Sequence, residues 1–378
     1  MLAPRRNRRL SYKAHSEVCT MTETRPHVLI ACNSDVRQRY VTAPDLERLE
    51  RFAIWQWVQC EGGRGVEPNE DPDALARLLE AAPGADAIVV CHGAPRIDAR
   101  VMDRAPRLRF IGELEGDRFA YRIDVEEAWR RGIRAVDTTQ GSSYPVAEWA
   151  LALILISLRN AGEQFRHMIQ HKEYRRPRTD FGYLYGELTG KTVGLIGCGH
   201  IGRRLISFLR PFQCTIFVYD PYLPKEIADV LGFTLTSLEY VFAHCDVVVC
   251  LAPLTPATRR MIGRRELELL HPGSVFVNVS RGAIVDSDAL IERLRRGDIV
   301  AGLDVFDPEP IPADSPIKDL PNVFLTPHIA GVTAASGPRF FRLMVDELER
   351  FFHGHETLYD LLPRTLANRR GEPPNSVR

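Results

Sequence analysis

Short apolar runs alternate with segments of helical periodicity along most of this chain. In its second half, six apolar runs of three to five residues are separated by stretches whose apolar positions recur at helical spacing. Such alternation predicts parallel β-strands connected by α-helices, and therefore an α/β fold with a doubly wound parallel sheet. The predicted strands are residues 193–196, 215–219, 247–251, 275–279, 300–303 and 323–325.

The same alternation occurs earlier in the chain and predicts a second, smaller α/β domain of flavodoxin-like type. Helical spacing returns at residues 340–352, where apolar side chains share one face, so this helix is expected to cross back onto the first domain. We therefore expect a substrate domain at 22–142, completed by 339–362, and a Rossmann domain at 143–338, with a hinged cleft between them. The earlier predicted strands are 27–32, 87–90, 109–111 and 135–136, separated by helices 72–82, 97–105 and 125–131.

Three segments lie outside this pattern. Residues 1–21 are rich in arginine but lack the apolar stretch of a signal peptide, so we expect a disordered tail or an upstream start codon before Met21, with a transit peptide as the alternative. Residues 363–378 are also expected to be disordered. The polar and aromatic segment 161–190 is either an arm that packs on a second subunit or a surface loop with a few anchoring aromatic side chains.

Composition narrows the class of protein. The chain has 49 basic and 49 acidic side chains, a balance that argues against a nucleic-acid-binding surface. Its eight cysteines form no Cys-x-x-Cys pair, so we expect neither a metal site nor a disulfide framework, and a reducing cytoplasm. The longest apolar run, 146–158, contains Glu148 and is too short to span a membrane, so it is interpreted as a buried helix.

The sequence Val-Gly-Leu-Ile-Gly-Cys-Gly-His-Ile-Gly, which ends at Gly202, joins a predicted strand to a helix through a glycine turn. Gly197 permits the tight turn, Gly199 lets a pyrophosphate approach the backbone, and Gly202 lets the helix pack closely on its strand. Asp220 ends the next strand 18 residues later, close to the roughly 20 expected for a carboxylate that binds ribose hydroxyls. A carboxylate at this position would repel the 2′-phosphate of NADP, so the pattern favours NAD. The simpler alternatives are that the glycines serve only the turn and that Asp220 only forms a turn.

Three polar side chains follow the carboxyl ends of later strands, the edge at which such sheets bind ligands. Arg281 has the shape to hold a carboxylate with two hydrogen bonds, and His328 can donate or accept a proton at a carbonyl oxygen. Glu309, if bonded to the second ring nitrogen of His328, would fix its tautomer and favour its protonated form. Taken singly, each has a simpler interpretation: a surface ion pair, a solvated carboxylate and a capped loop histidine.

Together these motifs resemble the D-isomer-specific 2-hydroxyacid dehydrogenase family, over about residues 80–355. The resemblance implies that Arg281, Glu309 and His328 are the catalytic set, with Arg281 on the substrate carboxylate and His328 as the acid and base. It rests on Val146-Ala-Glu148, Gly190-Lys-Thr-Val-Gly194 before the glycine turn, Pro253-Leu-Thr-Pro-Ala-Thr258, and residues 278–286, 304–310 and 327–331.

The same resemblance implies positions for the remaining ligand contacts. His200 and Ile201 lie under the pyrophosphate, Asp220 binds the adenosine ribose, and Asp304 contacts the nicotinamide carboxamide. The substrate carboxylate is bound by a backbone loop of the first domain, at His92, Gly93 and Ala94. Further implied cofactor contacts are Pro253 and Thr258 beneath the cofactor and Val279, Ser280 and Gly331 on its nicotinamide side.

The chain departs from the family pattern on the substrate side. Residues 112–124 replace a glycine-rich stretch, and residues 141–145 replace a segment that carries asparagine in relatives. The usual substrates therefore cannot be transferred to this chain. Arg118 and Arg122 in the first stretch either bind a phosphate or second carboxylate, or belong to a solvated charged loop. Formate dehydrogenases have glutamine where Glu309 stands, which argues against their chemistry.

The function expected from these observations is NAD-dependent interconversion of a D-2-hydroxy acid and its 2-oxo acid. The resemblance also implies a homodimer formed through the nucleotide-binding domain. The alternative is a non-catalytic protein that senses NAD(H), because related corepressors use the same fold to recognise partners.

Overall fold

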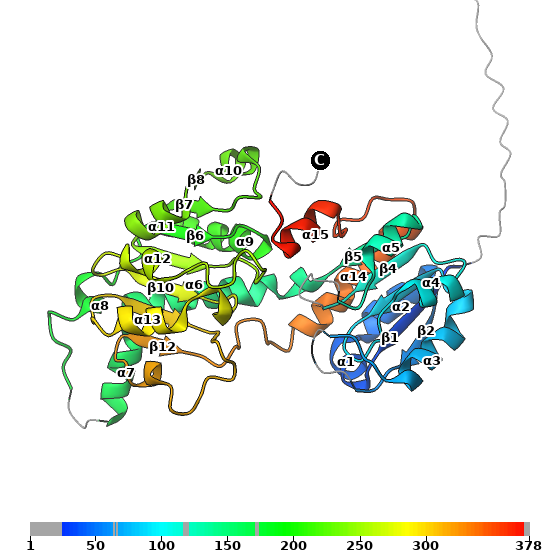
Figure 1. Cartoon of the computed structure of the whole chain (residues 1–378), viewed down its shortest axis with the longest axis horizontal. Coiled ribbons are helices and arrows are strands. Elements are labelled where there is room, and N and C mark those ends of the chain that lie inside the picture. Colours follow the sequence, from blue (N-terminus) through cyan, green and yellow to red (C-terminus); the bar gives the residue numbers. More distant parts are fainter. Residues whose placement is uncertain (1–24, 63–64, 66, 116–120, 171–173, 374–378) are drawn as a thin grey trace, which may run out of the picture.

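The computed structural model describes residues 25–62, 65, 67–115, 121–170 and 174–373. Two parallel sheets with helices on both faces form two lobes (Figure 1). The predicted α/β class with a doubly wound parallel sheet is confirmed. The predicted tail at 1–21 lies outside the described residues.

The first lobe is built on a five-stranded parallel sheet with the order β2-β1-β3-β4-β5. An apolar cluster covers each face of this sheet, which explains why its inner strands are buried on both sides. Its strands are β1 (His27–Cys32), β2 (Ile54–Gln59), β3 (Ala87–Val90), β4 (Phe110–Glu113) and β5 (Arg134–Asp137). Its helices are α1 (Ser34–Tyr40), α2 (Ala43–Phe52), α3 (Pro72–Ala81), α4 (Ala99–Arg104) and α5 (Val125–Arg130).

Helix α14 (Ser336–Phe352) returns from the second lobe and packs on the first sheet. Its apolar face joins the buried cluster that contains Val28 and Ile30 of β1. Gly112 in β4 lies so close to this helix that an added Cβ would collide with the side chain of Met344. The helical spacing seen in the sequence therefore corresponds to a helix packed against the first lobe.

The second lobe contains a seven-stranded parallel sheet with the order β12-β11-β10-β9-β6-β7-β8. Strand β6 lies between β9 and β7, so the chain winds outward in both directions from this point, where such sheets bind dinucleotides. Its strands are β6 (Thr192–Ile196), β7 (Thr215–Tyr219), β8 (Thr234–Leu235), β9 (Val247–Cys250), β10 (Val275–Asn278), β11 (Val300–Leu303) and β12 (Val323–Leu325).

The helices of the second lobe cover both faces of its sheet. They are α6 (Ser143–Leu158), α7 (Ala161–Gln170), α8 (Phe181–Leu184), α9 (His200–Leu209), α10 (Lys225–Leu231), α11 (Leu238–His244), α12 (Arg264–Glu268) and α13 (Ser287–Leu294), and α15 (Pro363–Arg370) follows α14. Short 3-10 turns occur at Ala82–Gly84, Thr139–Ser142, Arg210–Phe212, Gly282–Ile284 and Pro316–Asp319.

The apolar helix α6 packs against β10 and β11. Among the described residues, only the helical stretch Thr139–Leu158 has the length and composition to cross a membrane, and 56% of its apolar window is buried inside the protein. The burial is typical of a core helix. It agrees with the interpretation of residues 146–158 as a buried helix.

The structure corrects one expectation about the less regular segments and adds detail to another. Residues 363–370, expected to be disordered, form helix α15, because Ala367 is buried and the nearly buried Arg369 lies 3.6 Å from Asp137 of the first lobe. The composition of this segment does not reveal those tertiary partners. The described part of residues 161–190 contains the helices α7 and α8, so it is not a loop throughout, and its packing on a second subunit stays a prediction.

Candidate functional site

The turn after β6 has the geometry of a phosphate cradle. Gly197 has a φ of +95°, and a Cβ added to it would lie 3.0 Å from the backbone of Ala252. A Cβ on Gly202 would lie 2.8 Å from the carbonyl oxygen of Gly197, so helix α9 packs directly on the turn. Gly199, the N-cap of α9, has no atom within 4 Å of its Cβ position. The turn therefore leaves open space at a helix N-terminus, as a dinucleotide pyrophosphate requires.

Asp220 follows β7 and ties this turn to the neighbouring strand. Its Oδ2 accepts a hydrogen bond of 2.9 Å from the backbone of Cys198, and its Oδ1 accepts one of 2.9 Å from the backbone of Tyr222. The carboxylate is thus a turn former and, at the same time, lies at the strand end expected for a ribose ligand. The structure shows the turn-forming bonds, and the contact of Asp220 with a ribose stays a prediction.

The segments after β9 and β10 adjoin the glycine turn; the space along these strand ends, where the dinucleotide is predicted to bind, is called the NAD slot. Thr258 donates a hydrogen bond of 2.6 Å to the carbonyl oxygen of Pro253 and closes the loop between them. Ser280 donates to the carbonyl oxygen of Ala252, which fixes the end of β10 beside that loop, and Val279 is buried. The predicted cofactor contacts of both segments therefore lie at one edge of the sheet.

The side chains of Glu309 and His328 are in direct contact, as the sequence predicted for this pair. The ring Nδ1 of His328 lies 2.5 Å from the Oε1 of Glu309, and each side chain is about one-third exposed or more. The contact leaves Nε2 as the ring nitrogen available to a ligand. His328 has a φ of +54°, a left-handed conformation that costs roughly 1 kcal/mol or more for a non-glycine residue.

Asp304 holds His328 in this conformation. Its backbone carbonyl accepts a hydrogen bond of 2.8 Å from the backbone of His328. Its fully buried carboxylate accepts bonds from the Thr326 hydroxyl at 2.6 Å and from the backbones of Ile329 and Ala330, each at 2.9 Å. The sequence indicated a cofactor contact for Asp304. That contact stays a prediction; the structure shows that Asp304 positions the loop that carries the imidazole, a role for which the sequence held no signal.

Arg281 lies at the end of β10, on the same sheet edge. Its Nη1 donates a hydrogen bond of 2.7 Å to the carbonyl oxygen of Ser280. The next residue, Gly282, lies against Phe306, where an added Cβ would collide with the backbone. This close approach holds the segment of Arg281 against the segment that leads from Asp304 to Glu309.

A cleft of about 570 Å³ lies between residues of the first lobe and the segment after His328. Two predicted residues line it, His92 and Gly331. Gly93 has a φ of +88° and packs so closely on the backbone of Cys60 that only glycine fits. Sequence analysis missed several other lining residues, among them Tyr40, Glu115 and Thr333. Only Glu115 lies in a segment, 112–124, where the sequence departs from the family pattern.

Hydrogen bonds keep Glu115 ionised in this cleft. Burial acts to raise the pKa of Glu115, but bonds from the His92 ring, at 3.4 Å, and from the Tyr40 hydroxyl outweigh it and lower the pKa. Arg122, in contrast, is fully buried and paired with Glu113, so both sequence interpretations of Arg122 are wrong. Arg118 lies outside the described residues.

Cys91, His92 and Glu115 are residue types that bind metal ions and lie close together beside this cleft. Donor atoms of Cys91, His92 and Glu115 lie within 4.8 Å of one another. Burial, however, raises the pKa of the Cys91 thiol far above its usual range, and the Arg122 guanidinium lies 3.2 Å from the His92 Nδ1. A neutral thiol beside a fixed positive charge does not fit a cation.

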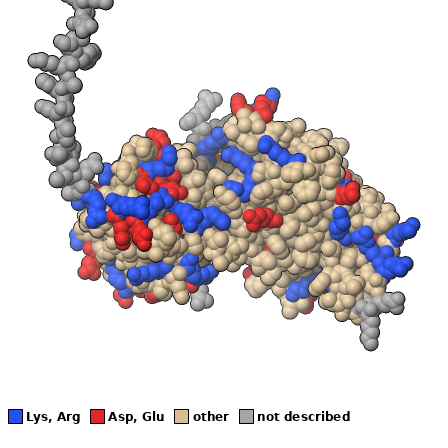
Figure 2. All heavy atoms as spheres, turned by 180° about the vertical axis from the view of Figure 1, so that it is seen from behind, with Lys and Arg blue, Asp and Glu red and all other residues tan. Residues whose placement is uncertain are grey.

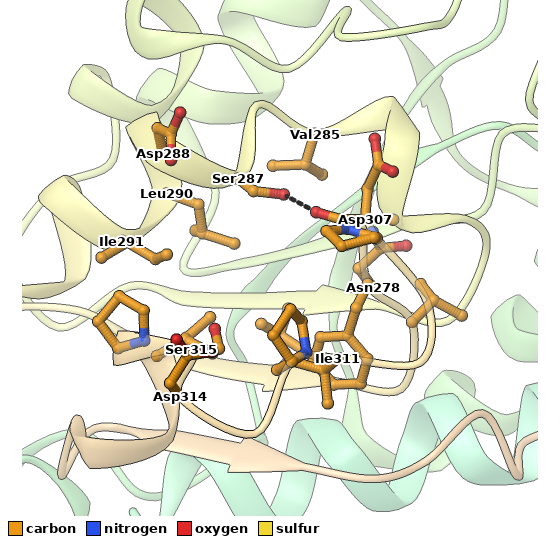
Figure 3. Close-up of a pocket in the computed structure, with 18 residues that line it drawn as sticks. Asn278, Val285, Ser287, Asp288, Leu290, Ile291, Asp307, Ile311, Asp314 and Ser315 are labelled. Carbon is orange, nitrogen blue, oxygen red and sulfur yellow. Dashed lines mark hydrogen bonds between the residues drawn. The ribbon is translucent and has the colours of Figure 1, made fainter.

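A second cavity, of about 300 Å³, lies between α13 and the segment 305–317 (Figure 3). The hydroxyl of Ser287 donates a hydrogen bond of 3.1 Å to the carbonyl oxygen of Asp307 across its rim. None of the residues predicted for the site lines this cavity. The cavity is lined by residues on either side of Glu309, among them Pro308 and Ile311, and it shares no lining residue with the cleft.

On the face shown in Figure 2, charged side chains of both signs are intermixed mainly on the first lobe, and the other lobe shows mostly uncharged residues with several groups of Lys and Arg. This pattern agrees with the zero formal net charge of the sequence. Large areas of the same face carry neither sign. The predicted site is therefore defined by individual side chains at strand ends and not by a broad electrostatic surface.

Comparisons with known proteins agree with this geometry. Residues 151–330 match the family model of the D-isomer specific 2-hydroxyacid dehydrogenase, NAD binding domain. A glyoxylate reductase of Aeropyrum pernix is 35% identical over 302 residues, which cover 79% of this chain and 87% of the reductase. A D-3-phosphoglycerate dehydrogenase of Methanocaldococcus jannaschii is 35% identical over 279 residues, 73% of this chain but only 52% of that enzyme.

A solved structure shares the whole architecture. The phosphoglycerate oxidoreductase from Rhizobium etli superposes with a TM-score of 0.76 at 24% identity, covering 89% of this chain and 98% of that one. The sequence and the fold lead to one assignment. This chain belongs to the D-isomer specific 2-hydroxyacid dehydrogenase family, and its second lobe is that family's NAD-binding domain.

Proposed function

We propose that this protein interconverts a D-2-hydroxy acid and its 2-oxo acid with NAD(H), using Arg281, Glu309 and His328. The observation that carries the proposal is the 2.5 Å contact between His328 Nδ1 and Glu309 Oε1. It lies on the sheet edge that also holds Arg281 and the glycine turn. Family membership supports NAD-dependent 2-hydroxyacid dehydrogenase activity in general, and the roles of these residues are the proposed part.

Each residue has one task in the proposed reaction. Arg281 binds the substrate carboxylate through two parallel hydrogen bonds and orients the carbonyl. His328 donates a proton from Nε2 to the carbonyl oxygen during reduction and accepts it during oxidation. Glu309 holds the tautomer and stabilises the protonated ring. Bound NAD(H) supplies the hydride acceptor or donor.

The backbone around Gly93 binds the other side of the substrate carboxylate. The cleft between the lobes contains His92, Tyr40 and Glu115, so substrate selection is assigned to these groups. Closure of the lobes excludes water from the reacting carbon. Gly331, between His328 and the cleft, lines the same space.

The test is NADH oxidation by the purified full chain. Glyoxylate, hydroxypyruvate, pyruvate, phenylpyruvate and phosphohydroxypyruvate form the substrate panel. We expect turnover with at least one, abolished in His328→Ala because the acid and base is lost. Turnover should fall at least about a hundredfold in Arg281→Ala because the two charge-assisted bonds to the substrate carboxylate are lost. His271→Ala, which alters a histidine on the same lobe outside the site, is the matched control and should keep full activity.

The same assay distinguishes an enzyme from a non-catalytic protein that senses NAD(H). If NADH binds but none of the five acids is turned over, the protein is better described as an NAD(H)-sensing binding protein. Unchanged turnover in His328→Ala would refute the acid-base role even if the protein is an enzyme. Glu309→Gln preserves an acceptor for Nδ1 but removes the charge that faces the ring, so we expect slower reduction with little change in KM.

The protein is further proposed to form a homodimer through the NAD-binding lobe, to act without nucleic-acid or membrane partners, and to reside in the cytoplasm. Helix α7 on this lobe exposes apolar side chains, which supports the dimer. The free cysteines of the described residues are mostly buried, which supports a reducing compartment.

A further inference from the structure

The C-terminal segment runs from the first lobe to the NAD-binding lobe, and α15 lies between the two (Figure 1). On the first lobe, the nearly buried guanidinium of Arg369 lies 3.6 Å from the carboxylate of Asp137 at the end of β5. Arg370 lies 3.0 Å from Glu126 on α5. These two ion pairs fix one side of α15.

The other side of the segment contacts the NAD-binding lobe. Arg364 donates a hydrogen bond to the backbone carbonyl of Tyr222. The Tyr222 hydroxyl in turn donates one of 2.9 Å to the backbone carbonyl of Glu372. Gly371 has a φ of +70°, and a Cβ added to it would lie 2.9 Å from the backbone nitrogen of Ala257. The backbone at 371–372 is therefore held between residues that follow β7 and residues that follow β9.

The backbone at 371–372 lies at one end of the NAD slot. Strand β6 lies between β7 and β9, and the pyrophosphate cradle follows β6. The adenosine half extends from this cradle past Asp220 at the end of β7, where the ribose binds. Tyr222 is two residues beyond Asp220, and Ala257 lies in the loop closed by Thr258. The two contacts of segment 371–372 thus flank the adenosine end of the slot.

A third contact reaches the cradle itself. The ring of Tyr359, in the connection between α14 and α15, meets the ring of His200 edge to face at 6.3 Å. His200 is the first residue of α9. The chain after α14 therefore lies along the slot from its pyrophosphate part to its adenosine part.

We propose that residues 363–372 form an autoinhibitory latch, which occupies the adenosine end of the NAD slot and must be displaced before the dinucleotide is fully seated. Because the latch is anchored to Asp137 and Glu126 on one lobe and to Tyr222 on the other, its release also removes a connection between the lobes. Binding of the dinucleotide therefore frees the two lobes to move relative to each other. The proposal rests on NAD binding and not on the catalytic roles proposed above.

The test uses the full chain with Arg364→Ala and Arg370→Ala combined, which removes one anchor on each lobe and no residue of the proposed catalytic site. Affinity is measured for ADP-ribose, which contains the adenosine half, and for nicotinamide mononucleotide, which lacks it. If the latch is closed nine-tenths of the time, the Kd for ADP-ribose should fall about tenfold and that for the mononucleotide should not change. Arg296→Ala, which removes a surface ion pair with Glu268, is the matched control.

Hydrogen exchange provides a second readout. The amides of Gly371 and Glu372 are bonded to Asn368 and Ala367 within the segment. Saturating NADH should increase exchange at these two amides in the wild-type chain. Protection of the segment by NADH would show a cover over bound cofactor and would overturn the proposal. Unchanged exchange, or equal changes in affinity for the two nucleotide fragments, would overturn it as well.

Discussion

At the scale of single residues, the glycines of the turn after β6 differ in what they do. A Cβ on Gly197 or Gly202 would press on backbone atoms, so these two glycines are required by the fold itself. Gly199 has open space around its Cβ position and a φ of −73°, which any residue adopts. The predicted approach of a pyrophosphate to the backbone would account for a glycine at this position.

We therefore expect Gly199→Ala to leave the thermal unfolding midpoint unchanged and to weaken NADH binding by about tenfold or more, equivalent to roughly 1.4 kcal/mol. Fluorescence titration with NADH and a thermal melt measure the two effects. Gly84→Ala, at another glycine with open space around its Cβ position, should change neither. Normal NADH affinity in Gly199→Ala would contradict the placement of the pyrophosphate.

Asp220 is the residue expected to discriminate between the two nicotinamide dinucleotides. Its carboxylate would repel a 2′-phosphate, a contact between like charges that costs several kcal/mol. Asp220→Ser should raise the affinity for NADPH relative to NADH by at least about tenfold. The ratio of the two dissociation constants is the measurement, with Asp229→Ser on α10 as the control. An unchanged ratio would leave Asp220 as a turn residue only.

Residues at strand ends were the predictable part of the candidate site. Arg281, Glu309 and His328 follow apolar strands, and the carboxyl ends of parallel strands meet at one edge. The contacts made by Asp304 were not predictable, because they depend on where two loops meet. Tyr40 and Glu115 are distant in sequence and join only through the packing of the first lobe.

At the scale of elements, apolar runs predicted the buried strands well and the exposed ones poorly. Strand β2 was not predicted, because it lies at the edge of its sheet and most of its residues are exposed or only partly buried. Strand β8, with two residues, is too short to form a pattern. Helix α15 was missed because ion pairs to other elements, and not an apolar face, hold it.

The turn after α14 depends on one fully buried carboxylate, that of Glu347. Its Oε2 accepts hydrogen bonds from the backbones of Leu358 and Tyr359, at 2.7 and 3.1 Å. Burial raises the pKa of Glu347 above 4.5, and these two bonds only partly offset the effect. Between the unfolded and folded pKa values the folded chain binds the extra proton, so the free energy of unfolding falls as pH rises.

Glu347→Gln keeps an acceptor oxygen and removes the charge. We expect its free energy of unfolding to match the wild type at about pH 4 and to exceed it at about pH 8, by roughly 1.4 kcal/mol for each unit of the raised pKa. Denaturant titrations at several pH values measure the difference. Glu356→Gln, at a side chain that is 85% exposed, should reproduce the wild-type slope. Parallel slopes for Glu347→Gln and the wild type would contradict the argument.

At the scale of the whole molecule, the described chain passes between the lobes at the start of α6, at the start of α14 and in the segment of α15. Tyr144 lies at the first crossing, between the guanidinium carbons of Arg204 on α9 and Arg339 on α14, which are 3.2 and 4.6 Å from its ring centroid. Residues from three helices thus meet where the lobes join. The start of α14 also lines the cleft, through Ser336 and Gly337. A movement of the lobes about this crossing therefore changes the distance between His92 and Gly331.

Helix α7, on the NAD-binding lobe, carries a group of exposed apolar side chains. Phe165, Met168 and Ile169 on α7 are 63%, 63% and 66% exposed and lie three and one residues apart, on one side of the helix. A contiguous exposed apolar group of this kind is typical of a protein–protein interface. A second copy of the chain is the partner that family membership favours.

We therefore expect a particle of twice the chain mass in sedimentation equilibrium at micromolar concentration. Ile169→Asp places a charge in the interface, which costs several kcal/mol when it is buried without a partner, and should produce monomers. Val230→Asp adds the same charge at a 79% exposed position on α10 of the same lobe and should remain dimeric. A monomeric wild type, or a dimeric Ile169→Asp, would exclude α7 as the interface, whatever the catalytic activity of the variants.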